Sequence, residues 1–373
     1  MQLYCTKHHH SRSVFHRASL SCSSLLLILF LASCGQPARG IGSSGGTLTS
    51  PTVVSGKPVT LQSIRMFDAN TGWAVTSDGK RLLHTTHGAL HWQDVTPAFG
   101  SPTSINGSTN FLDAETAWVV GNDSTNLVVY RTSDSGVNWQ KAQVPDQSRG
   151  KSQITFLNTQ VGWLVVGKGA GAGSEAVDVL HTSDGGATWK VISVASYTTV
   201  NQPGTLPFEG DKTGISFVNA STGWMTGFTN REHFAWLYMT HDGGATWQPQ
   251  AIPLPASASQ VSLFPPVFFN ASDGIMPVEV PGPQTGQTTN IYVTHDGGTS
   301  WHTTSAVPVS LVSTNIVFVD ATHGWIADNH EGIANNTYIN STLYSTSDGG
   351  QHWTQHTIKL GADITMLTFV SHT

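Results

Sequence analysis

Acidic residues that occur outside any repeat are the first candidates for chemistry in this sequence. Two carboxylates placed on either side of a glycosidic bond can cleave it, one acting as general acid and the other as base or nucleophile. Glu209, Asp211, Glu232 and Glu331 lie in long polar segments of this kind. No motif selects a pair among them, so glycosidic cleavage stays an open alternative without an assigned catalytic residue.

A larger set of carboxylates recurs in the frame Thr-x-Asp-x-Gly-x-x-Trp, about once every fifty residues. A repeat of that length marks one supersecondary unit. The glycines accept positive φ, the Asp and Thr oxygens can hydrogen-bond the turn backbone, and the Trp offers a large apolar surface. Because carboxylates spread over repeated turns do not converge on one substrate, we expect a structural role. The Asp and Trp residues of the five clean copies are Asp134 and Trp139, Asp184 and Trp189, Asp242 and Trp247, Asp296 and Trp301, and Asp348 and Trp353.

The first copy of the motif is degenerate and runs from Thr85 to Trp92, with His87 in the position of the Asp. His241 and His295 occupy a variable position in two later copies. Because these two turns belong to different units, we expect the imidazoles to be exposed and not to share a metal ion. The repeat therefore predicts neither a metal site nor a bound cofactor.

A second element lies upstream of the turns, with a Phe followed shortly by Gly-Trp, as in Phe156 to Gly162-Trp163, although the fifth repeat has Ile275 in place of the Trp. Each unit then holds four short strands, which end or begin at the Phe, the Gly-Trp pair, the Asp turn and the turn Trp. Such units in series predict an all-β fold, a β-propeller of four-stranded blades. Six blades are favoured. Seven are possible because residues 364–370 repeat the first strand of a unit and could be completed by strands from residues 47–60.

These motifs resemble the Asp-box, or BNR, repeat. Together with the Phe-x-Asp/Asn-x-x-x-Gly-Trp element, they are most similar to the propellers of the photosystem II stability and assembly factor family, over nearly all of residues 61–370. The resemblance implies a propeller that binds other proteins and catalyses nothing. The arginine-rich surface of that family is not evident here, so the photosystem role does not carry over.

The same repeat also marks sialidases and some xyloglucan-cleaving enzymes, which makes a sialidase-like glycosidase a more distant resemblance. A sialidase needs three arginines around the substrate carboxylate, but Arg65 lacks the family's Arg-Ile-Pro sequence and Arg131 adjoins an Asp-box on the wrong face. A sialidase also needs a Tyr–Glu nucleophile pair with an Asp acid, and neither Tyr338 nor Tyr344 is accompanied by such residues. Without several guanidinium groups a carboxylate-bearing sugar is poorly held, so this resemblance is one of fold.

Insertions in the repeat predict where a partner binds. Strands alternate in direction, so the Asp-box turns lie on one face of the ring, and the insertions at 168–176, 196–213, 228–235, 253–265, 280–290 and 329–341 lie on the other. Binding residues tend to sit on variable loops of a rigid scaffold. For Trp236, packing in the core is the alternative to contact with a partner, because it directly precedes residues of a predicted strand. The candidate contact residues are Tyr197, Phe208, Glu209, Asp211, Arg231, Glu232, Trp236, His330, Glu331 and Tyr338.

Residues 1–33 have the order of an export signal: basic residues, the apolar run 25–31, and then small residues. That run is too short to span a bilayer. Leu31 to Cys34 resembles the bacterial lipobox, which implies that Cys34 becomes the lipidated first residue. Ordinary cleavage nearby, with release of a soluble protein, is the alternative. Residues 34–56 are rich in Gly, Ser, Thr and Pro and predict a flexible linker, and residues 57–373 predict one large domain.

Composition narrows the partners. All three cysteines lie within the first 34 residues, so the expected domain has no disulfide. The net charge is −6, with 17 basic and 23 acidic residues, which argues against nucleic acid and against membrane binding beyond the anchor. The sequence thus predicts a non-enzymatic interaction or assembly module on the outer face of the cell membrane. Its expected partner is an envelope protein or a cell-surface polysaccharide, and a carbohydrate-active propeller is the alternative.

Overall fold

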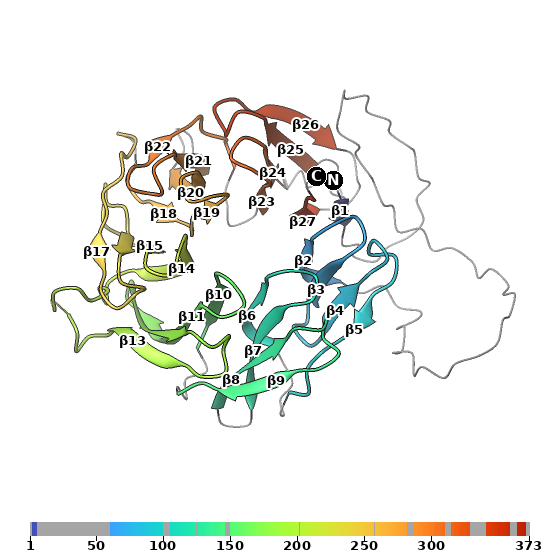
Figure 1. Ribbon diagram of the computed structural model, residues 1–373. Coiled ribbons are helices and arrows are strands. Elements are labelled where there is room, and N and C mark those ends of the chain that lie inside the picture. The colour runs from blue at the N-terminus through green and yellow to red at the C-terminus, as the bar shows by residue number, and fades with distance from the viewer. Residues whose placement is uncertain are drawn as a thin grey trace, which may run out of the picture.

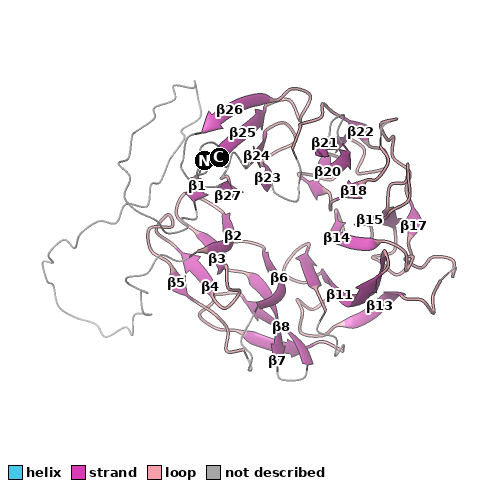
Figure 2. Ribbon diagram, turned by 180° about the vertical axis from the view of Figure 1, so that it is seen from behind, coloured by secondary structure: helices cyan, strands magenta, loops and turns pink. Residues whose placement is uncertain are grey.

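The computed structural model describes residues 2–5, 60–99, 105–123, 126–145, 150–200, 202–256, 258–281, 287–309, 315–328, 341–358 and 364–370. Every regular element in these ranges is a β-strand, so the chain is all-β as predicted. None of the described residues belongs to a helix long and apolar enough to span a membrane. Figure 1 shows the strands as a ring of sheets with the two termini side by side, and Figure 2 shows the same ring from behind.

Four of the sheets are antiparallel and contain four strands each in sequence order. The first contains β2 (Leu61–Met66), β3 (Gly72–Thr76), β4 (Leu82–Thr85) and β5 (Gln93–Asp94). The second contains β6 (Ile105–Phe111), β7 (Ala117–Asp123), β8 (Asn126–Thr132) and β9 (Gln140–Gln143). The third contains β10 (Ser152–Phe156), β11 (Gly162–Gly171), β12 (Ser174–Thr182) and β13 (Lys190–Ala195). The last contains β23 (Asn315–Phe318), β24 (Gly324–Asp328), β25 (Ser341–Thr346) and β26 (Thr354–Ile358).

The fourth and fifth repeats are joined into one nine-stranded sheet by the pairing of Phe228 with Ser262. The innermost strand of the fifth repeat is split into two pieces around Pro265 and Pro266, because proline cannot donate to a sheet ladder. The strands are β14 (Asp211–Phe217), β15 (Gly223–Phe228), β16 (Leu237–Thr240), β17 (Gln248–Pro249), β18 (Ser262–Leu263), β19 (Val267–Phe268), β20 (Gly274–Pro281), β21 (Gln287–Thr294) and β22 (His302–Thr303).

A two-stranded sheet lies where the ring meets its own beginning (Figure 1). It pairs β1 (Gln2–Cys5) with β27 (Ile364–Thr368), which is the tail strand expected from the sequence. Met66 N of β2 donates a hydrogen bond to Thr368 Oγ1 at 3.1 Å. The partner of β27 therefore comes from the predicted leader, whereas most of residues 47–60, the expected completing segment, lies outside the described residues.

Each hydrophobic cluster lies between two neighbouring repeats, or between the last repeat and β27. Along β11, Leu164 and Val166 pack toward the preceding sheet, while Trp163 and Val165 pack toward the following one. Side chains alternate across a strand, and here both faces are buried, which is why this strand begins with an unbroken apolar run. The core is thus a chain of sheet-on-sheet contacts instead of one central cluster.

Phe156 explains the Phe and Gly-Trp elements together. It covers Gly162 of its own sheet so closely that a Cβ on Gly162 would lie 2.5 Å from the Phe156 ring. Its other face stacks on Trp118 of the preceding sheet at 3.7 Å, and Trp189 of its own sheet meets it edge-on at 5.9 Å. The same stack recurs between consecutive repeats in the pairs Trp73 and Phe111, Trp163 and Phe217, and Trp224 and Phe268, and between the last repeat and the tail in the pair Trp325 and Phe369.

Two of the expected insertions are strands and not open loops. Residues 168–176 mostly extend β11 and β12 into a long hairpin, which turns at Ala172 and Gly173, both with positive φ. The glycines of this segment therefore mark a tight turn and a register shift rather than irregular structure. In the same way, β20 continues to Pro281 and β21 starts at Gln287.

Candidate functional site

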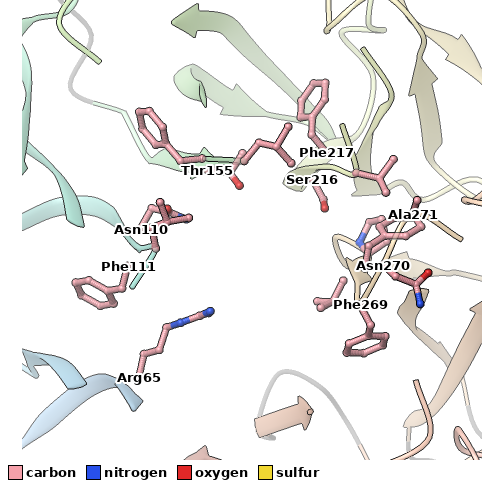
Figure 3. Close-up of a pocket in the computed structure, with 16 residues that line it drawn as sticks. Arg65, Asn110, Phe111, Thr155, Ser216, Phe217, Phe269, Asn270 and Ala271 are labelled. Carbon is pink, nitrogen blue, oxygen red and sulfur yellow. The ribbon is translucent and has the colours of Figure 1, made fainter. Parts of the chain in front are cut away.

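The larger of two described cavities, about 550 Å³, lies among the inner strands. In five of the inner strands, the residue just before the Phe position lines this cavity, with Met66 at the Phe position of β2. These residues are Arg65 of β2, Asn110 of β6, Thr155 of β10, Ser216 of β14 and Val267 of β19. Figure 3 shows the side chains of Arg65, Thr155 and Ser216 directed into this space. The rest of the lining consists of Phe111, Leu112, Phe156, Leu157, Phe217, Val218, Pro266, Phe268, Phe269, Asn270 and Ala271.

Arg65 is the only charged side chain among the described lining residues. Its guanidinium lies 5.1 Å from the centre of the Phe67 ring. Burial among the strands lowers the pKa of Arg65, although its surface is open to solvent in the cavity. The structure places no carboxylate of the described chain within ion-pair distance of it, so the guanidinium contributes an unpaired positive charge to the cavity.

A smaller cavity of about 250 Å³ lies between β10, β12 and β14 and contains Glu175 and Lys212 in its lining. Lys212 is buried, and its Nζ donates to three main-chain oxygens: Glu175 O at 2.7 Å, Gly210 O at 2.8 Å and Phe208 O at 3.1 Å. The Lys212 backbone N–H also donates to Glu175 Oε2 at 2.7 Å. Burial lowers the pKa of Lys212 to about 8, while Glu175 opposes that shift.

The Lys212 contacts hold the inserted loop 196–210 against the ring. Trp236 Nε1 donates to Glu209 O at 2.8 Å, and Lys212 lies 5.0 Å from the Trp236 ring centre. On the solvent side of this support, Arg231 pairs with Glu209 at 3.8 Å and stacks over Phe234 at 4.0 Å. Two insertions, 196–213 and 228–235, are thereby joined into one charged and aromatic surface, which we call the loop cluster: Glu209, Arg231 and Phe234.

The structure separates the sequence candidates into three groups. Tyr197, Glu209, Asp211, Arg231 and Glu232 are exposed. Phe208 is half-buried, and Trp236, only 1% exposed, lies in the core, as its alternative interpretation predicted. His330, Glu331 and Tyr338 lie outside the described residues, as does Cys34.

None of the seven described candidates lines either cavity. The residues that the sequence interpretation missed are Asn110, Thr155, Ser216 and Lys212, and Arg65 was considered only as a sialidase residue. The sequence contained a signal for Asn110, Thr155 and Ser216, since each directly precedes the Phe of its repeat. It contained no signal for Lys212, because the partners of its Nζ are main-chain oxygens. In the described ranges, no cluster of three or more His, Cys, Asp or Glu side chains could hold a metal ion.

The five Asp turns share one hydrogen-bond pattern. In the third-repeat turn, Thr182 Oγ1 donates to Asp184 Oδ1 at 2.7 Å and accepts from Gly186 N at 2.9 Å. Thr188 donates to both carboxylate oxygens, through its N–H at 2.9 Å and its hydroxyl at 2.6 Å. Each carboxylate is thus engaged within its own turn. The corresponding Thr-to-Asp bonds are those of Thr132, Thr240, Thr294 and Thr346.

These turns predict a dependence of stability on acid. Hydrogen bonds from Thr188 lower the pKa of Asp184 to about 2, and those from Ser300 and His352 do the same for Asp296 and Asp348. Because the folded pKa lies below the ordinary 3.8, the stabilisation is complete above that pH and is lost as the pH falls through about 2.

We therefore expect Asp184→Asn to be less stable than the wild type at pH 5, with a difference that shrinks toward pH 2. Urea unfolding at a series of pH values measures it. Glu232→Gln, a neutral substitution in an exposed loop, is the control and should show no such trend. A stability difference for Asp184→Asn that stays constant with pH would contradict this account.

The ring of antiparallel sheets has the architecture of a β-propeller protein. A GH74 xyloglucanase from Xanthomonas campestris matches with a TM-score of 0.53 and 15% identity, over 82% of this chain and 46% of that chain. A GH74 enzyme from Niastella koreensis matches with a TM-score of 0.54 and 14% identity, over the same shares. This chain therefore spans about half the length of those enzymes, and at such identities the likeness concerns the fold.

A structure of YCF48 bound to a D1 peptide also matches, with a TM-score of 0.49 and 17% identity, over 80% of this chain and 82% of that chain. No protein-family model matches the sequence, and the search of curated proteins found no match. The fold confirms the prediction of an all-β propeller.

Proposed function

We propose that this chain is a non-enzymatic Asp-box propeller that binds a protein of the cell envelope through the loop face opposite the Asp turns. The observation that carries the proposal is the loop cluster of Glu209, Arg231 and Phe234. Its loops are held in place before any partner arrives, because Lys212 and Trp236 bond the main chain beneath them. Ordered loops lose less entropy on binding, and a charged and aromatic surface suits a protein interface.

We also propose six four-stranded blades and an incomplete seventh. The inner strands β2, β6, β10, β14, β19, β23 and β27 follow one another around the centre (Figure 1). The stack of Trp325 on Phe369, at 4.0 Å, repeats the contact that joins the other sheets. In this assignment β27 is the first strand of the seventh blade.

The proposed location is the outer face of the cell membrane, with lipidated Cys34 as the anchor. The proposed location rests on the sequence of the leader, residues 1–33, and of the linker, residues 34–56. A comparison of wild type and Cys34→Ser in membrane and medium fractions tests it. Release of the variant into the medium is expected, and an unchanged distribution would remove the anchor from the proposal.

Capture from a detergent-solubilised envelope tests the binding surface. The variant combines Tyr197→Ala, Arg231→Ala and Glu232→Ala, all on exposed insertions. The matched control combines Leu90→Ser and Val137→Ser, which remove exposed apolar side chains from the Asp turns. A protein retained by wild type and control but lost from the variant is the expected result. Retention or shortening of polysaccharide would favour the carbohydrate-active alternative, and retention of the protein by all three would exclude the loop face.

A further inference from the structure

The central cavity has two chemically different walls. One wall is polar and cationic, with Arg65, Asn110, Thr155 and Ser216 from four consecutive inner strands. The opposite wall comes from the fifth repeat and is mostly apolar, with Pro266, Val267, Phe268 and Phe269 beside the single polar residue Asn270. Val267 is 49% exposed, among the few large apolar side chains that are open to solvent. A molecule that fits this space therefore carries a negative group at one end and an apolar part at the other.

The charge of the cavity lining limits which anionic group a ligand can carry. Arg65 is the one ionised group of the described lining, so it matches a single negative charge. A guanidinium binds a carboxylate through two parallel N–H···O bonds. Thr155 of β10 and Ser216 of β14 present hydroxyl groups to other parts of the same cavity (Figure 3). A volume of about 550 Å³ is in the range of small-molecule sites.

We propose that the central cavity binds a small organic carboxylate, with its anionic group at Arg65 and its apolar remainder against Val267. This site is distinct from the loop cluster, and either can fail without the other. The described contact of the Arg65 guanidinium is the Phe67 ring, with no carboxylate of the described chain in ion-pair distance. Its charge is open to the cavity, which is expected of a residue kept for a ligand and not for the fold.

Calorimetric titration of the purified full chain with hexanoate, acetate, 1-hexanol and hexyl phosphate tests the proposal. Hexanoate is expected to bind more tightly than acetate, which lacks the apolar part, and than 1-hexanol, which lacks the charge. Arg65→Gln should weaken hexanoate binding by about tenfold or more, the scale of a lost charge-assisted pair. Val267→Ser should weaken hexanoate and leave acetate unchanged. Arg81→Gln, at a partly buried position that does not line the cavity, is the matched control.

A second measurement distinguishes a ligand site from a structural arginine. Without ligand, Arg65→Gln should unfold at the same temperature as the wild type, because the described contact that it removes is the one with the Phe67 ring. A lower unfolding temperature of Arg65→Gln together with no hexanoate binding by the wild type would assign Arg65 to the fold and overturn the proposal. Equal hexanoate binding by wild type and Arg65→Gln would also overturn it. Tighter binding of hexyl phosphate than of hexanoate would overturn the carboxylate assignment.

Discussion

Trp163→Ala is expected to lower the free energy of unfolding by about 4 kcal/mol, the scale of a large buried aromatic lost from a core. Trp163 is fully buried and stacks on Phe217 of the next sheet at 3.5 Å with planes 4° apart. Its Nε1 donates to Gly243 O, in the Asp turn of that next sheet, at 2.8 Å. The substitution thus removes both the apolar contact and the polar contact between two neighbouring sheets.

Urea unfolding followed by tryptophan fluorescence measures the loss. Trp163→Phe separates the two contributions, since it keeps an aromatic ring beside Phe217 but leaves Gly243 O without the indole donor. We expect it to cost about 1–2 kcal/mol, the scale of one unmade hydrogen bond plus a smaller ring. Equal losses for the Ala and Phe substitutions would show that stacking does not join the sheets.

Lys212→Met is expected to lower the free energy of unfolding by about 2 kcal/mol. The main-chain oxygens of Glu175, Phe208 and Gly210 would each lose a hydrogen bond in a buried place, at about 1 kcal/mol each. Phe208 O keeps the Glu175 N–H as a donor at 3.1 Å, so its loss is the smallest of the three. Removal of the charge relieves the desolvation that lowers the pKa of Lys212, and this offsets part of the loss.

Two further readouts make the Lys212 prediction specific. Because its folded pKa of about 8 lies below the ordinary 10.5, the unfolded chain binds more protons between these pH values, and wild-type stability gains a rising component there that Lys212→Met lacks. The loop 196–210 should also become more susceptible to limited proteolysis. Lys190→Met, at an exposed strand position, is the control. A loss no larger than that of the control would contradict the prediction.

The sequence was sufficient for features that recur. Phe156, Gly162 and Trp163 belong to a pattern repeated along the chain, and the contacts that explain it recur between neighbouring sheets. Features that occur once were harder to predict. The segment 168–176 was expected to be an inserted loop, but its residues pair from Gly169 to Ala176, and this pairing overrides the low strand propensity of its glycines.

The site was only partly predictable, for two physical reasons. Lys212 acts on main-chain oxygens brought together by the fold, and such partners leave no residue pattern. Arg65, Thr155 and Ser216 are chemically dissimilar, so they do not look like a set until the inner strands align them around one space. By contrast, the buried state of Trp236 followed from its place beside a strand.

The joint between β27 and β2 differs from its neighbours in a way that affects how the ring opens. Trp–Phe stacks join consecutive repeats of the chain, but among the described residues no such stack joins β27 to β2. Here the Met66 N–H donates to Thr368 instead. Met66 also takes the place of the Phe over Gly72. No described hydrophobic cluster bridges this joint. Local opening of the ring should therefore begin at this joint. In a hydrogen-exchange experiment, the amide hydrogens of β2 and β27 should exchange sooner than those of β10 and β11.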